Sequence, residues 1–107
     1  MFTHAVLFEI QPKEVAKYHA DNRMWVFYAR KAKGFISYRT MQRVDHKNQY
    51  ACVYEWKAKI YHDRFMKKYH DCLVAKSGAR VKVLGYFNFK SGYSVAPPHK
   101  RSQNSLR

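Results

Sequence analysis

The sequence has few cysteines and no long apolar run. Its 2 cysteines, Cys52 and Cys72, form no CxxC pair, and each falls inside a segment with a regular pattern. This placement predicts buried free thiols in a reducing compartment, with a single disulfide as the alternative. No apolar stretch approaches the roughly 18 residues of a membrane span, and no signal-like segment opens the chain. We therefore expect a cytoplasmic protein with no membrane partner.

Acidic residues are scarce as well. Only 7 Asp and Glu residues stand against 21 Lys and Arg residues, so the chain of 107 residues has a formal charge of +14. Such a charge attracts phosphates, carboxylates, acidic lipid surfaces and nucleic acid at low salt, but it specifies no fold. Nucleic acid is therefore a partner that the charge permits, although it is not the one we favour. The length predicts a single domain that gains stability from a partner subunit.

Glycine and proline are rare, at 4 and 3 residues, and Pro12, Gly34 and Gly78 fall where regular segments would end. Residues 2–10 are apolar on both faces, which predicts a central strand that ends before Pro12. Residues 13–33 contain neither Gly nor Pro and predict one helix that ends at Gly34. Its last turns carry three cations that suit a helix C-terminus: Arg30, Lys31 and Lys33. Its inward stripe at helical spacing comprises Val15, Tyr18, Asn22, Trp25 and Ala29.

The second half of the chain adds two strands, a helix and a last strand. Residues 35–44 and 49–56 predict an antiparallel hairpin with a short polar loop. Residues 57–77 predict a helix that ends at Gly78. Residues 80–90 predict a strand with Gly85 at a bulge or a close approach, and with four apolar side chains on one face: Val81, Val83, Phe87 and Phe89. The order β-α-β-β-α-β predicts an α+β, ferredoxin-like domain over residues 1–90, followed by a flexible basic tail over residues 91–107.

Aromatic residues are abundant, at 17% of the chain, which is more than a minimal core requires. Many of them fall in residues 50–78, where an inner strand leads directly into the second helix. One face of that strand carries Tyr50, Cys52, Tyr54 and Trp56. One stripe of the helix carries Tyr61, His62, Phe65, Tyr69 and Leu73. Together these side chains predict an aromatic pocket between the sheet and the helix.

The second face of the sheet must also be covered, and two arrangements would do so. The face can pack on the same face of a second subunit, or it can serve as a platform on which RNA bases stack. The strand motif of RNA recognition modules matches residues 48–55 only at Tyr50, Ala51 and Val53. Cys52 replaces a stacking ring and Glu55 adds a negative charge there, so the pattern favours a homodimer.

Several short motifs occur in a characteristic order. Gly34-Phe35 follows the long first helix, Glu55-Trp56 ends the third strand, and Phe65 is followed by His70 and then by Gly78-Ala79-Arg80. In these features, residues 2–90 resemble the antibiotic biosynthesis monooxygenase-like dimeric α/β barrels. The resemblance implies a homodimer whose sheets pack face to face, with a pocket between the sheet and the helices of each subunit. It also implies oxidation of a small aromatic compound, such as a quinol or a polyketide-like molecule, with O2 and without a bound metal or flavin.

One branch of that family binds heme and opens it, and this branch fits the chain less well. Its pattern requires an Asn on the first strand, a Trp on the second helix and a His further along that helix. Here the first strand has no Asn, Phe65 occupies the place of the Trp, and His70 lies about one turn too early. We therefore expect no cofactor, with heme as the alternative. A non-catalytic protein that binds a small ligand or nucleic acid is the alternative to an enzyme.

Three histidines are the candidates for acid-base chemistry in such a pocket: His62, His4 and His70. A neutral imidazole near pH 7 can take the proton of a phenol or quinol, which then passes an electron to O2 more readily. His62 and His70 are eight residues apart on one helix and do not face the same way, so we predict no shared metal ion. The residues predicted to shape the pocket are Phe65, Tyr69, Tyr54, Trp56 and Arg39.

Each candidate also has a purely structural interpretation. The histidines can pack at the edge of the helix or of the strand, and Tyr54 and Trp56 can be rings of the core or of the dimer interface. Arg39 lies on a face that is otherwise apolar, so it must be paired or must hold an anionic ligand. Glu55 or Glu9 would be its simplest partner. The remaining histidines, including His46 in the hairpin loop, are expected to be solvated.

Overall fold

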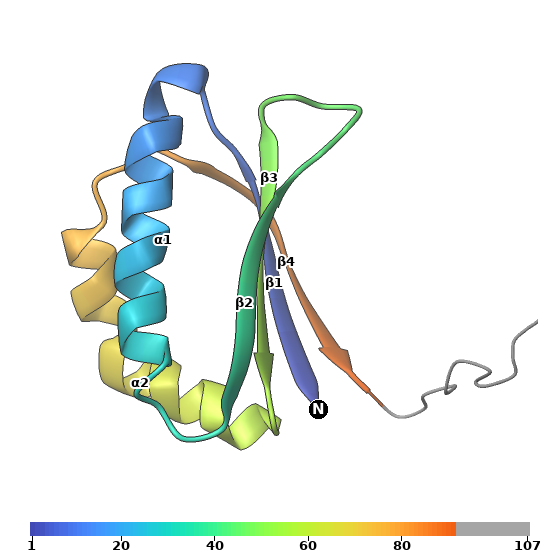
Figure 1. Ribbon diagram of the computed structural model, residues 1–107, viewed down its shortest axis with the longest axis vertical. Coiled ribbons are helices and arrows are strands. Elements are labelled where there is room, and N and C mark those ends of the chain that lie inside the picture. Colours follow the sequence, from blue (N-terminus) through green and yellow to red (C-terminus); the bar gives the residue numbers. More distant parts are fainter. Residues whose placement is uncertain (92–107) are drawn as a thin grey trace, which may run out of the picture.

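The sheet is the centre of the fold. The computed structural model describes residues 1–91, in which four antiparallel strands lie in the order β2-β3-β1-β4 and both helices cover one face (Figure 1). The strands are β1 (Phe2–Glu9), β2 (Phe35–Gln42), β3 (Gln49–Trp56) and β4 (Lys82–Lys90). The helices are a 3-10 turn (Pro12–Glu14), α1 (Val15–Ala29) and α2 (Lys59–Lys76). The predicted α+β, ferredoxin-like fold is confirmed, whereas the predicted tail, apart from Ser91, lies outside the described residues.

The first helix is shorter than predicted. A 3-10 turn precedes α1, which ends at Ala29, so the expected cations follow the helix instead of occupying its last turn. The chain turns sharply at Gly34, just before β2, where the φ angle is 86°. This backbone conformation favours glycine. A Cβ at Gly34 would also overlap the ring of Tyr61 at the start of α2. Gly34 therefore sets both the turn and the close approach of α2.

A bulge in β4 changes which side chains face the helices. In the register with β1, Leu7 pairs with Gly85 and Phe8 pairs with Val83, so Leu84 is an extra residue. The bulge expected near Gly85 is confirmed. The expectation that four apolar side chains share one face is wrong, because the extra residue reverses the alternation. Val83 faces the helices, whereas Phe87 and Phe89 lie on the opposite face of the sheet.

The core lies between the sheet and the helices and has two parts. One cluster of buried residues comprises Phe2, Ala29, Trp56, Phe65 and Leu73. The other comprises Ile10, Tyr18 and Cys52. Among the described residues, no helix is both long and apolar enough to cross a membrane.

Two carboxylates on the first helical segment hold the loop that follows α2. Asp21 accepts the backbone N–H groups of Gly78 and Ala79, both at 2.9 Å, and Glu14 accepts that of Arg80 at 2.8 Å. The Arg80 N–H group is also the main reason why the pKa of Glu14 is lowered. These bonds fix the loop against α1 and so define one wall of the space between the helices and β4.

Candidate functional site

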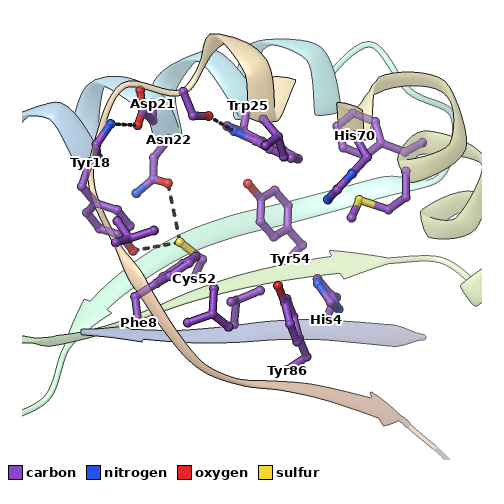
Figure 2. A pocket seen from close by; sticks show the side chains of 18 of the residues that line it. His4, Phe8, Tyr18, Asp21, Asn22, Trp25, Cys52, Tyr54, His70 and Tyr86 are labelled. Atoms are coloured by element: carbon purple, nitrogen blue, oxygen red, sulfur yellow. Dashed lines mark hydrogen bonds between the residues drawn. The ribbon is translucent and has the colours of Figure 1, made fainter. Parts of the chain in front are cut away.

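A cavity of about 430 Å³ lies between the sheet and the two helices. Its size is within the range of small-molecule sites in proteins. The sheet contributes His4, Val6, Phe8, Cys52, Tyr54, Trp56, Val83 and Tyr86. The helices contribute Tyr18, Asp21, Asn22, Trp25, His62, Phe65, Met66, His70 and Val74. Figure 2 shows the rings of Tyr54 and Tyr86 pointing from the sheet into the space below α1.

The strand register explains why these side chains meet. His4 pairs with Tyr54 on β3 and Val6 pairs with Cys52. Directly paired residues project from the same face of a sheet, and alternate residues along a strand share that face. The rings of β3 that the sequence singled out therefore face the helices. The face of β3 that lies away from the helices carries Ala51, Val53 and Glu55.

His62 has the most distinctive environment of the three candidate histidines. Its side chain is 13% exposed, and its Nδ1 lies 3.2 Å from Oδ1 of Asp63. A carboxylate can only accept, so Nδ1 carries the hydrogen and Nε2 is left as an acceptor. Nε2 is buried and has no hydrogen-bond partner among the described residues. Burial lowers the pKa of His62, so the imidazole is neutral at pH 7.

The carboxylate beside His62 is ionised and anchored. Asp63 also accepts a hydrogen bond from Lys59 at 2.7 Å, one helical turn earlier. The hydrogen bonds from Lys59 and His62 lower the pKa of Asp63. The three side chains therefore form a line from the exposed helix surface to the cavity, with the free Nε2 at its inner end.

His4 lies beside His62 in the wall of the cavity. The two imidazole centroids are 4.5 Å apart. Nδ1 of His4 donates to Oδ1 of Asn88 on β4 at 2.7 Å, and its ring stacks at 6.2 Å from that of Tyr86. His4 is therefore held by its neighbours on β4, and it forms one end wall of the cavity together with His62.

His70 lies at the rim of the cavity. Its side chain is 47% exposed, and its Nδ1 lies 3.0 Å from Oδ1 of Asp71. Its ring meets that of Trp25 edge to face at 6.2 Å. The His70–Asp71 pair thus repeats the arrangement of His62 and Asp63, but in contact with solvent.

Three of the residues predicted to shape the pocket line the cavity, and two do not. Tyr54, Trp56 and Phe65 are part of its wall. Tyr69 lies behind it, where its ring packs 5.3 Å from those of Tyr28 and Phe65. Arg39 pairs with Val53 on the opposite face of the sheet, so its placement in the pocket is wrong.

The predicted partners of Arg39 are also wrong. Glu55 accepts a hydrogen bond from the hydroxyl of Ser37 at 2.6 Å. Within residues 1–91, Arg39 forms no ion pair with Glu55 or Glu9. Strand alternation placed Arg39 correctly with Ser37 and Met41, but alternation alone does not say which of two faces meets the helices.

A polar network at the other end of the cavity was not predicted. The hydroxyl of Tyr18 lies 2.8 Å from Sγ of Cys52 and 2.8 Å from Oγ1 of Thr40. The thiol of Cys52 donates to Oδ1 of Asn22 at 3.6 Å (Figure 2). Burial raises the pKa of Cys52 and of Tyr18, so neither of these two side chains carries a charge. The sequence feature that could have indicated this network is Asn22, an amide side chain in a helix stripe that is otherwise largely apolar.

The cysteines are both free, but only one is buried. Cys52 is a buried thiol, as predicted, and Cys72 is exposed on α2, which corrects the expectation of two buried thiols. Residues 1–91 contain no cluster of three or more His, Cys, Asp or Glu side chains that could hold a metal ion.

Buried polar atoms without partners mark the cavity wall. Within the part of the chain that the structure describes, these side-chain atoms are Nδ2 of Asn22, Nε1 of Trp56 and Nε2 of His62. All three residues line the cavity. Buried polar groups in proteins are normally hydrogen-bonded, so two donors and one acceptor are available to a bound molecule.

No protein-family model matches the sequence, and the comparison with curated proteins finds no relative. Comparison with solved structures finds a candidate antibiotic biosynthesis monooxygenase from Deinococcus radiodurans, with a TM-score of 0.73 at 10% identity over 90% of this chain and 97% of that one. SnoaB from Streptomyces nogalater, a cofactor-independent oxygenase, gives a TM-score of 0.70 at 12% identity over 88% of this chain and 95% of that one. The chain therefore has the fold of antibiotic biosynthesis monooxygenase structures.

Proposed function

We propose that the protein binds a small aromatic phenol or quinol in the cavity and oxidises it with O2, without a metal or flavin. The observation that carries the proposal is the buried, unpartnered Nε2 of His62, whose Nδ1 is anchored by Asp63. A neutral imidazole held in this way is suited to act as a general base. The fold is that of SnoaB, which is a cofactor-independent oxygenase.

The walls of the cavity suit an aromatic ligand. Rings from both layers surround it, including Tyr54 from β3 and Trp25 from α1. Although the chain has 21 Lys and Arg residues, none of those in residues 1–91 lines the cavity. The Lys and Arg side chains of the described residues therefore lie outside the cavity, which favours a neutral, apolar molecule with a few hydrogen-bonding groups.

The proposed reaction begins when Nε2 of His62 takes the phenolic proton. The phenolate passes one electron to O2, and the resulting superoxide joins the aryloxyl radical at a ring carbon that carries hydrogen. The peroxide anion takes back the proton from Nε2 of His62. Loss of water, whose second hydrogen is that of the ring carbon, then leaves a carbonyl, so one oxygen atom enters the product and the other leaves as water. The substrate supplies all four electrons, and no external reductant is needed. Nε1 of Trp56, a buried donor without a partner, is available to stabilise the negative oxygen.

The proposal includes a homodimer. The helices cover one face of the sheet (Figure 1), and the other face exposes apolar side chains, among them Met41, Phe87 and Phe89 at 46%, 47% and 58%. Exposed apolar patches of this kind favour burial against a partner. The central strands contribute Ala5, Leu7, Ala51 and Val53 to this face and no aromatic ring, so among the described residues the rings of this face on which nucleic-acid bases could stack are confined to the edge strand β4.

O2 consumption is the experiment that tests the proposal. The purified protein is treated with a chelator and screened with phenols and quinols at pH 7. We expect uptake of O2 with at least one of them, and a loss of about 10²- to 10⁴-fold in His62→Ala. His46→Ala, which removes an exposed histidine of the hairpin loop, is the matched control and should keep full activity. Unchanged turnover in His62→Ala would remove His62 from the reaction.

Two further measurements separate the proposal from its alternatives, which are ligand binding without catalysis and heme binding. A protein that only binds its ligand would show a dissociation constant for a phenol but no O2 uptake. Heme is the alternative occupant, because a free imidazole Nε2 has the chemistry of an axial ligand. A heme titration followed by absorbance would then give a ligated spectrum that is lost in His62→Ala. Our proposal predicts no such spectrum.

A further inference from the structure

The outer side of the two helices carries positive charge that acidic side chains do not balance. The acidic residues of α1 and α2 are Asp21, Asp63 and Asp71, and each already accepts a hydrogen bond within residues 1–91. Several exposed cations of this layer form no ion pair within the same residues: Arg23, Arg30, Lys31, Lys68 and Lys76. Such a surface attracts a partner of negative charge.

Three of these lysines lie over aromatic rings. The distances from Nζ to the ring centroid are 4.1 Å for Lys31 over Phe27, 5.2 Å for Lys68 over Tyr69 and 5.8 Å for Lys76 over Tyr28. The rings also contact one another, because the centroid of Tyr28 lies 5.3 Å from those of Phe27 and Tyr69. Together these side chains form the lysine-ring strip, which runs from α1 to α2 where the two helices lie side by side (Figure 1).

Phe27 is the part of the lysine-ring strip that is most open to an aromatic partner. Its side chain is 55% exposed, whereas Tyr28 and Tyr69 pack partly against the core. Arg23 lies one helical turn earlier on the same side of α1, and Lys31 covers the ring from the turn after the helix. The proposed dimer would bury the opposite face of the sheet, so the strip stays accessible in a dimer.

The chemistry of the strip fits a single strand of nucleic acid. Each nucleotide carries a phosphate, which Lys and Arg neutralise, and a planar base, which stacks on aromatic side chains. An exposed cation–π pair is weak, so a lysine can leave its ring for a phosphate when a base takes its place. In a duplex the bases already stack on one another, so they offer no free face to a protein ring.

The same surface suits a membrane less well. A helix that lies in a membrane interface buries a broad apolar face among the lipids. Along α1, Phe27 is the exposed large apolar side chain, and the neighbouring exposed positions carry Ala20, Arg23 and Arg30. One ring among cations offers little area for insertion, whereas it is sufficient for stacking of a base.

We infer that the lysine-ring strip binds single-stranded nucleic acid, with Phe27 as the stacking platform and Lys31, Lys68 and Lys76 as the phosphate contacts. This inference goes beyond the proposed function and does not depend on it, because the strip lies on the outside of the helices and the cavity lies beneath them. It assigns a partner to the charge of the protein, which the proposed oxidation does not use.

The phosphate contacts are tested by fluorescence anisotropy with the full-length protein and dye-labelled oligothymidylate or oligouridylate of about 12 nucleotides. The test variant combines Lys31→Gln, Lys68→Gln and Lys76→Gln, and the control combines Lys47→Gln, Lys82→Gln and Lys90→Gln, which are exposed and remove the same charge. Between about 50 mM and about 200 mM salt, the slope of log K against log salt should be shallower by about 2 in the test variant. The control should keep the wild-type slope, and equal losses in the two variants would overturn the inference.

The stacking contact is tested at Phe27 with two substitutions of opposite expectation. Phe27→Leu keeps an apolar side chain but removes the ring, so the single strand should bind at least about fivefold more weakly. Phe27→Trp keeps a stacking surface and should retain the wild-type affinity. A duplex of the same length should bind more weakly than the single strand and should be insensitive to both substitutions. Wild-type binding of the single strand by Phe27→Leu would refute the stacking role and with it the inference.

Vesicles of phosphatidylcholine and phosphatidylserine distinguish a membrane from a nucleic acid as the partner. Our inference predicts that the protein prefers the oligonucleotide at the same salt concentration. Binding to the vesicles but not to the oligonucleotide would make the strip a membrane surface and would overturn the inference. Absence of binding to the single strand at low salt would overturn it as well, while the proposed oxidation would be unaffected.

Discussion

The Asp63–His62 pair allows a sharp test of the proposed base, because α2 carries a second pair of the same kind. Asp63→Asn removes the negative charge beside Nδ1 of His62 and leaves a side chain of the same size. Asp71→Asn makes the same change beside His70, where the Nδ1 to Oδ1 distance is 3.0 Å instead of 3.2 Å. Only the first pair ends in a buried, unpartnered Nε2.

The size of the effect follows from the exposure of the carboxylate. Hydrogen bonds to charged groups contribute about 1.5–3 kcal/mol when they are buried. The side chain of Asp63 is 44% exposed, so solvent screening places the strength of this bond below that range. The bond strengthens when His62 takes the phenolic proton and becomes positively charged. Its loss should therefore lower kcat about fivefold. Binding of the phenol should change little.

The pH dependence of the rate is an independent test of His62 as the base. The pKa of His62 is lowered by burial, and the hydrogen bond that its Nδ1 donates to Asp63 opposes that shift. The base works only when it is unprotonated, so activity should be constant above pH 7 and should fall in acid, below the ordinary histidine pKa of about 6.5. Removing the charge of Asp63 lowers the pKa further, so the acid limb of kcat should move to lower pH.

The measurement is the rate of O2 uptake with a substrate of the wild-type protein, from pH 4.5 to pH 8. Asp63→Asn should combine a lower plateau with an acid limb at lower pH, and Asp71→Asn should follow the wild type in both respects. If Asp63→Asn keeps the wild-type plateau and the wild-type limb, the carboxylate does not act on the base. Equal effects of the two substitutions would show that surface charge, and not the buried pair, governs the rate.

Two further predictions concern the fold and the assembly. Gly34→Ala should lower the free energy of unfolding by about 2–5 kcal/mol in urea denaturation, because positive φ and overlap with Tyr61 both oppose a Cβ. Gly78→Ala, where a Cβ meets no atom within 4 Å, is the control, and an equal loss in both would contradict this explanation. Phe87→Asp on the open face should convert a dimer into a monomer in size-exclusion chromatography, whereas Phe27→Asp on the outside of α1 should not. A wild-type monomer at micromolar concentration would refute the dimer.

Much of the fold could be predicted because the periodicity of apolar residues and the positions of Gly and Pro are local properties of the sequence. Strand β3 begins and ends where its alternation does, at Gln49 and Trp56. The first helix was overestimated because neither Gly nor Pro marks its ends at Val15 and Ala29. The faces of β4 were assigned wrongly because the bulge at Leu84 appears only in the register with β1.

The candidate site was likewise predicted only where local spacing determines it. Alternation grouped Cys52, Tyr54 and Trp56, and helical spacing placed His62 and Phe65 together, as the cavity wall does. Tyr69 belongs to that helical stripe, yet it lies behind the wall because its ring packs against Tyr28.

The sequence by itself determined the order of the elements, the inner position of β1 and β3, and the side chains that share a face, because these follow from local spacing and from apolar character. Only the tertiary structure decided which face meets the helices, and it placed Arg39 outside the cavity and Asn22 inside it. It also decided which polar atoms are left without partners, since Nε2 of His62 and Nδ2 of Asn22 depend on neighbours from several elements. Burial and pairing are properties of the packed chain, and they distinguish these two side chains from other histidines and asparagines of the sequence.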